Sequence, residues 1–184
     1  MNIFFVNQSP LAAARDLPDK LVVKMTLESA QLLSTAHRVL APGAEGQARC
    51  DQMGYYRATH ANHPSAVWCR ESAANYRWLW HHLHALACEY HERYDKYHAV
   101  QRTLLMKRLW LLPEALHQGD QPAINMITWE TTRPHPLCMP EQFHGPSVTD
   151  SYRLYLARGK SYINDGTAWA RRSGGPPAWY AEAL

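Results

Sequence analysis

The sequence predicts a mainly α protein: a single compact helical domain over residues 1–184, with one short strand at its N-terminus. Three observations support this fold class. Apolar residues make up 46% of the chain, which is enough to bury a core. Several segments repeat apolar residues at the three- and four-residue spacing of amphipathic helices. Residues 2–6 instead are predicted to form a short buried strand, because the four residues after Asn2 are all apolar.

The first half of the chain is expected to depend on one long helix. Ser9 and Pro10 have the order of an N-cap followed by proline at the first helical position, so a short helix is predicted over residues 11–15. Residues 19–40 place their apolar side chains on one helical face, and a Pro-Gly pair follows them. The next segment, residues 43–62, is rich in glycine and polar residues and is predicted to be a loop.

The second half is predicted to contain further helices joined by a long connection. A helix start is expected at Asn62-His63-Pro64, with the helix running to about residue 72. Proline is frequent between residues 118 and 147, but the apolar residues there predict an ordered crossing loop. The remaining helices are predicted over residues 74–98, 100–112 and 147–164.

Several classes of protein are disfavoured by what the sequence lacks. The four cysteines are scattered without a C-x-x-C pair, which predicts neither a zinc site nor a redox motif but idle thiols in a reducing compartment. The chain has no secretory signal and no apolar stretch of the ~20 residues that span a membrane, so we expect a cytoplasmic protein without a membrane partner. Phosphate-binding loops and serine-esterase elbows are also missing, and no cofactor is expected.

Charge and aromatic content favour DNA as the partner. The formal net charge is +3, and tryptophan, tyrosine and histidine are interleaved with arginine. Aromatic rings stack on bases and guanidinium groups bind phosphates, although an ordinary aromatic core has the same composition. The oligomeric state is left open.

The most informative segment is the helix predicted over residues 19–40. Lys20, Lys24 and Glu28 lie on one stripe, opposite much of the apolar face. Lysine before glutamate is the less favourable order for an ion pair, and two lysines in the first turns oppose the helix dipole. One interpretation is a solvated face with an ordinary ion pair. The other is a functional site in which the helix start attracts phosphate and Glu28 stabilises a cation or moves a proton.

A second candidate site precedes the helix that starts at Pro64. His60, Asn62 and His63 stand just before the predicted helix N-terminus, where phosphate binds readily, and histidine exchanges protons near neutral pH. Downstream, Arg70 is a candidate for clamping phosphate and Asn75 for contacting a base edge. The alternative is a helix cap with two histidines exposed to solvent.

Two further groups of residues are candidates for a functional site. His81, His84 and Cys88 share a helical face, but one helix offers too few converging ligands, so a polar and partly buried face is preferred over a metal site. The C-terminal tail contains side chains that suit backbone contact and base stacking or wedging, or alternatively a docked C-terminus. These tail residues are Arg171, Arg172, Trp179 and Tyr180.

Residues 21–28, LVVKMTLE, resemble the early helix of the pyrimidine-dimer DNA glycosylase/AP lyase family, endonuclease V. The resemblance implies that Glu28 is the catalytic glutamate. It also implies that the α-amine at the start of the chain, here that of Met1, attacks the sugar C1′ and forms a Schiff base. Lys24 is the alternative nucleophile. The chain departs from the family at Leu21 and Leu27, where the family has histidine and arginine, and at Asn2, which hinders removal of the initiator methionine.

The chain is also similar to a group of small, mostly uncharacterised phage proteins. The shared patterns are D-K-x-V-V-K-M-x-x-E-x-A-Q at residues 19–31, T-H-x-N-H-P at residues 59–64 and W-x-R-x-S at residues 68–72. This second resemblance implies no activity. If the chain is phage-encoded, the cytoplasm of the host cell is its expected location.

Together these patterns predict a DNA base-excision enzyme, a glycosylase with or without AP lyase activity, acting on a damaged or modified pyrimidine. Glu28 and the amine of Met1 would perform the chemistry, while the residues of the second candidate site hold phosphates or the extruded base. Two alternatives remain open. One is an enzyme that modifies a pyrimidine base or nucleotide, and the other is a non-catalytic module that binds DNA or a host protein.

Overall fold

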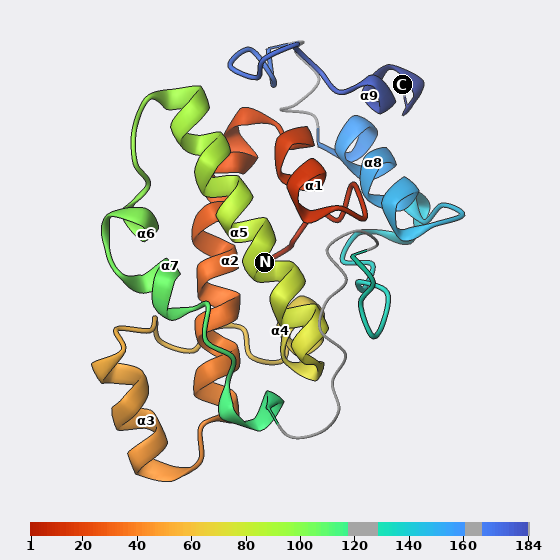
Figure 1. Ribbon diagram of the computed structural model, residues 1–184. Coiled ribbons are helices and arrows are strands. Elements are labelled where there is room, and N and C mark those ends of the chain that lie inside the picture. The colour runs from red at the N-terminus through yellow and green to blue at the C-terminus, as the bar shows by residue number, and fades with distance from the viewer. Residues whose placement is uncertain (118–128, 161–166, 184) are drawn as a thin grey trace.

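Two long helices, α2 (Asp19–Leu40) and α5 (Ala73–Tyr94), lie side by side at the centre of the fold (Figure 1). The computed structural model describes residues 1–117, 129–160 and 167–183. Two shorter helices, α1 (Pro10–Asp16) and α4 (Pro64–Glu71), pack against this pair. The chain is mainly helical, as its apolar periodicity predicts.

The remaining elements are short and surround the central helices. They are α3 (Gly43–Gln52), α6 (Ala99–Arg102), α7 (Leu105–Arg108), the 3₁₀ turns η1 (Glu114–Leu116) and η2 (Glu141–Phe143), α8 (Val148–Gly159) and α9 (Ala178–Ala183). In the described parts of the chain, none of the helices combines the length and the apolar character that crossing a bilayer requires.

The core forms where the apolar faces of α2 and α5 meet. Val22, Met25 and Leu32 of α2 are buried, as the predicted stripe requires, and Trp78 of α5 is fully enclosed. Trp169, far along the chain, joins the same cluster. Burying each such side chain stabilises the fold by roughly 1.5–3 kcal/mol, so these contacts dominate the packing.

The predicted N-terminal strand is wrong for a specific reason. Phe4 adopts a left-handed backbone conformation with φ of 56°, which interrupts extended geometry. Local bonds take the place of strand pairing: the side-chain oxygen of Asn2 accepts from the backbone N–H groups of Ile3 (2.8 Å) and Phe4 (3.1 Å), and Val6 N donates to Phe4 O at 2.8 Å. Val6 O accepts from Arg153 Nε at 2.9 Å. The segment is buried, as its apolar character predicts, but it pairs with no strand in the described residues.

Other element boundaries also differ from the sequence prediction. Residues 43–52 form helix α3 rather than loop. The predicted helix over residues 74–98 ends at Tyr94, because Asp95 takes a left-handed conformation with φ of 50°. Residues 100–112 are not one helix: α6 and α7 are separated by Thr103 and Leu104.

The predictions for the C-terminal third are met in part. The crossing segment is irregular over residues 129–147 apart from η2, while residues 118–128 lie outside the described residues. Helix α8 ends at Gly159, and the predicted continuation over residues 161–164 also lies outside them. Helix α9 is not anticipated by the sequence pattern, because a six-residue helix shows too little periodicity.

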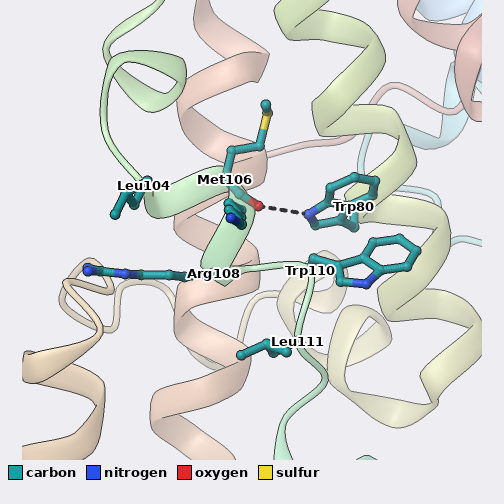
Figure 2. A pocket seen from close by; sticks show the side chains of 7 residues that line it. Trp80, Leu104, Met106, Arg108, Trp110 and Leu111 are labelled. Carbon is teal, nitrogen blue, oxygen red and sulfur yellow. Dashed lines mark hydrogen bonds between the residues drawn. The ribbon is translucent and has the colours of Figure 1, made fainter.

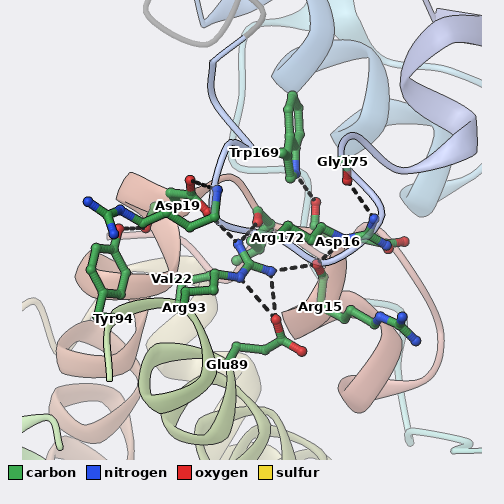
Figure 3. A network of polar contacts seen from close by, with 12 residues as sticks. Arg15, Asp16, Asp19, Val22, Glu89, Arg93, Tyr94, Trp169, Arg172 and Gly175 are labelled. Carbon is green, nitrogen blue, oxygen red and sulfur yellow. Dashed lines mark hydrogen bonds and ion pairs between the residues drawn. The ribbon is translucent and has the colours of Figure 1, made fainter. Parts of the chain in front are cut away.

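A buried network of charges ties the tail to the central helices (Figure 3). Arg93 of α5 pairs with Asp19 (3.1 Å) and Glu89 (2.7 Å), and it donates to the backbone oxygens of Leu17 and Arg15. Asp19 also accepts from the backbone N–H of Arg171 at 2.9 Å. The network therefore fixes the start of α2 and the tail in one place.

Candidate active site

The stripe predicted on α2 places a carboxylate beside the start of the chain. Glu28 Oε2 accepts a hydrogen bond from the backbone N–H of Asn2 at 3.2 Å. Glu28 Oε1 lies 3.5 Å from Lys24 Nζ, and the two side chains are 15% and 64% exposed. Glu28 is thus held against the backbone of Asn2, while its cationic partner remains exposed to solvent.

The side chain of Asn2 fixes the geometry of this terminus. Its oxygen accepts two backbone N–H groups, and its Nδ2 donates to Cys138 O at 3.0 Å. Sequence reasoning missed this positioning role. Asparagine side chains often accept hydrogen bonds from the backbone N–H groups that follow them in a turn. The Asn directly before the apolar residues 3–6 was therefore a signal that could have predicted this role.

The turn formed by residues 59–63 is attached to the same face of α2. Thr35 Oγ1 accepts from Thr59 N at 3.2 Å and donates to Thr59 O at 3.3 Å. His60 adopts a left-handed conformation with φ of 49°, which is uncommon for a residue with a side chain and is often found at functional sites. His63 N then donates to His60 O at 2.8 Å and closes the turn.

His63 joins this turn to the Glu28 site. Its Nδ1 caps α4 by accepting from Ser65 N at 3.2 Å. Burial, followed by the positive charges of the N-terminal amine and His60, lowers the pKa of His63, whereas Glu28 acts in the opposite direction. A neutral imidazole whose Nδ1 is an acceptor has its proton on Nε2. The pKa of His63 therefore responds to the charges of both the N-terminal amine and Glu28.

Two predicted site residues form hydrogen bonds within the protein. Arg70 Nη1 donates to Ala61 O at 2.6 Å and so supports the turn from one side. Asn75 is fully buried: its Nδ2 donates to Trp68 O at 2.8 Å, and its Oδ1 accepts from Thr132 N at 3.1 Å. Because its amide is used inside the protein, Asn75 has no access to a base edge. Asn62, His60 and Lys20 are exposed.

The tail residues dock onto the body of the protein. Trp179 and Tyr180 are buried, and Trp179 Nε1 donates to Asp16 Oδ2 at 3.0 Å. Arg172 bonds to Asp16 and to backbone oxygens. The guanidinium of Arg171 lies 5.0 Å from the Tyr94 ring centre. The docked C-terminus, one of the two interpretations of this segment, therefore describes the tail, and a base-stacking or wedging role does not fit its burial.

The histidine face of α5 has aromatic rather than metal-binding surroundings. His84 Nδ1 lies 3.9 Å from Cys88 Sγ, and His81 contacts the rings of Trp110 and Trp129. In the part of the chain that the structure describes, no three histidine, cysteine or acidic side chains are grouped as metal ligands. The polar, partly buried face expected from the sequence is what α5 presents here.

Comparison of the chain with protein-family models, with curated proteins and with solved structures gave no match. The two resemblances therefore depend on the quoted residues alone, and the functional argument depends on the geometry of the site.

Proposed function

We propose that the chain is a DNA base-excision enzyme that acts on a damaged or modified pyrimidine. One observation carries the proposal: the backbone nitrogen of Asn2, the residue next to the N-terminal amine, lies 3.2 Å from Glu28 Oε2. The lowered pKa of His63, to which burial and the positive charge of the amine contribute, supports it. Amine, carboxylate and imidazole groups are characteristic of acid–base and covalent catalysis.

The proposed reaction assigns one role to each group. The amine of Met1 forms a bond to the sugar C1′ while the C1′–base bond breaks, and the departing base takes up a proton. Opening of the sugar ring then leaves a Schiff base between the amine and C1′. Glu28 stabilises the positive charge that develops on the sugar, and His63 holds or transfers a proton.

Exposed side chains around the site supply contacts for a nucleic acid. Lys20 and Lys24 extend along α2 on one side of Glu28, and His60 and Asn62 are exposed in the adjoining turn. Cationic and amide groups of this kind bind phosphate oxygens and fix the register of a strand. Arg70 contributes indirectly, by supporting the turn through Ala61.

Borohydride trapping tests the proposal directly. The protein is incubated with duplex DNA that contains either a pyrimidine dimer or an abasic site, reduced with borohydride, and digested for mass spectrometry. We expect a stable protein–DNA adduct on the N-terminal peptide, and we expect it to be lost when the amine is blocked by acetylation. Base release without an adduct would reduce the activity to that of a monofunctional glycosylase. Neither adduct nor base release, or a modified nucleoside in the digest, would contradict excision.

A further inference from the structure

A second surface, remote in sequence from Glu28, has the properties of a protein-binding groove. The α7 groove has a volume of about 580 Å³ and is lined mainly by Trp80, Leu104, Met106, Trp110 and Leu111 (Figure 2). Leu104 is 60% exposed, Leu111 54% and Trp110 43%. Soluble proteins rarely gather large apolar side chains at the surface unless something binds there.

The walls of the α7 groove are held in place before any partner binds. Trp80 Nε1 donates to Met106 O at 3.1 Å, and the rings of Trp80 and Trp110 meet edge to face with centres 4.5 Å apart. The guanidinium of Arg77 lies 4.1 Å from the Trp110 ring centre and also donates to Trp110 O. Preformed tryptophan surfaces lose little side-chain entropy on binding, as is typical of interface hot spots.

The charged side chains that line the groove are cationic. Residues 96–113 contain Lys96, Arg102, Lys107 and Arg108, and the nearest acidic residues in the sequence, Asp95 and Glu114, stand just outside this segment. Lys107 and Arg108 belong to the lining itself. An apolar floor beside cationic side chains is complementary to a ligand that has apolar residues on one face and carboxylates next to them.

We propose that the α7 groove binds an acidic amphipathic helix of a partner protein. Helices of this kind insert apolar residues at i, i+3 or i+4, and i+7 into a groove and place charged residues along its edge. A protein partner fits the groove better than single-stranded DNA does, because nucleic acids bind through aromatic stacking and phosphate contacts. Here three of the lining side chains, Leu104, Met106 and Leu111, are aliphatic and offer no stacking surface.

The proposal is tested with a designed peptide, because the natural partner is unidentified. The probe is a fluorescent helical peptide with leucines at i, i+3 and i+7 and glutamates flanking them, and its binding to the full chain is followed by anisotropy. We expect saturable binding that weakens at least tenfold in the double variant Leu104→Ser/Leu111→Ser. Leu11→Ser, which alters a leucine on α1 that is 51% exposed, is the matched control and should bind like the unmodified protein.

Four further measurements test the charge preference and decide between occupants. A peptide with lysines in place of the glutamates should bind at least tenfold more weakly, and Lys107→Glu should weaken binding of the acidic peptide. Preference for a single-stranded oligonucleotide over the acidic peptide would overturn the proposal. So would self-association of the protein, measured by sedimentation, that disappears in the double leucine variant. Equal binding by the double leucine variant and the unmodified protein would overturn it as well.

Discussion

Helix α2 has two partly buried carboxylates, Asp19 and Glu28, whose surroundings differ sharply. Asp19 accepts from the buried guanidinium of Arg93 and from the backbone N–H of Arg171, and Arg93 in turn is paired with Glu89 (Figure 3). Glu28 accepts from one backbone N–H, and its ion-pair partner Lys24 is 64% exposed. The two carboxylates are nine positions apart on the same helix, but only Asp19 is enclosed in a network of fixed donors.

The difference shows that a carboxylate can act on another molecule only if donors within the fold do not already neutralise its charge. Asp19 is enclosed by fixed donors, so its charge is neutralised within the fold and contributes to docking the tail. Glu28 has one fixed backbone donor, and its other partner is an exposed lysine, whose ion pair contributes little to stability. A carboxylate in the second situation can exchange its partner for a substrate, which is why Glu28 and not Asp19 is the candidate catalytic group.

The largest effect is expected from Arg93→Ala. This change leaves the buried Asp19 and the half-buried Glu89 without their shared cation, so the free energy of unfolding should fall by about 3–5 kcal/mol. Urea denaturation measures the loss. The control is Arg49→Ala, whose pair with Glu114 is 3.9 Å long and exposed, and which should cost less than about 1 kcal/mol. Similar losses in the two variants would show that the buried network stabilises the fold no more than an exposed ion pair does.

The second prediction separates the two carboxylates directly. Glu28→Gln should reduce base release by about 10²–10⁴-fold, because it removes the charge and the proton-transfer group. Its side-chain oxygen still accepts from Asn2 N, so the free energy of unfolding should change by less than about 1 kcal/mol. Asp19→Asn should do the reverse and destabilise the fold by more than about 2 kcal/mol. Kinetic assays and thermal melts of both variants test this, and a glutamine variant that melts like the asparagine variant would refute it.

The sequence predicted the parts of this protein that depend on local periodicity. The helix over residues 19–40 and the helix starting at Pro64 are confirmed, because apolar spacing specifies the first, and proline at the first helical position with the His63 cap specifies the start of the second. The strand at residues 2–6 was wrong, since an apolar run is equally consistent with a buried irregular segment. Its conformation depends on Asn2, Arg153 and Glu28, which are contacts that no local pattern encodes.

The same limit explains the outcome for the site. The Lys24–Glu28 pair follows from helical spacing, but bringing the chain start and His63 toward Glu28 required knowing how distant segments pack against α2. Burial of the tail also depends on residues that are distant in the sequence. Trp179 donates to Asp16, which lies more than 160 positions earlier in the chain. Asn75 looked suitable for base recognition because its amide is chemically capable of it, but its burial in α5 was not visible from residue type.

The third prediction concerns acid stability, which should depend on buried histidines rather than on the charge network. Burial lowers the pKa of His37 and His82 to about 4, and that of His135 to about 3. In the unfolded chain the ordinary value is near 6.5, so the unfolded state binds protons first. Stability should therefore be complete above about pH 6.5 and decline as the pH falls toward 4, by up to about 1.4 kcal/mol per pH unit for each histidine.

Urea denaturation at a series of pH values measures this slope. The variant His135→Phe retains an aromatic ring against Phe5, with which His135 is stacked at 5.8 Å, and removes one titrating group. It should show a shallower decline between pH 6 and 4 than the unmodified protein. An unchanged slope would mean that the acid sensitivity originates elsewhere, and the carboxylates around Arg93 would then be the groups to examine.

The smallest effect is expected from Lys24→Ala. Because Lys24 is 64% exposed and its pair with Glu28 is in the unfavourable helical order, the free energy of unfolding should change by less than about 0.5 kcal/mol. The borohydride adduct should persist, in lower yield, and should map to the N-terminal peptide, because the lysine supplies charge near the phosphates and the amine supplies the nucleophile. Complete loss of the adduct, with folding intact by circular dichroism, would instead make Lys24 the nucleophile. The exposed partner of Glu28 would then be the reactive group. The contrast with Asp19 would become sharper, because its partner Arg93 is buried and cannot reach a substrate.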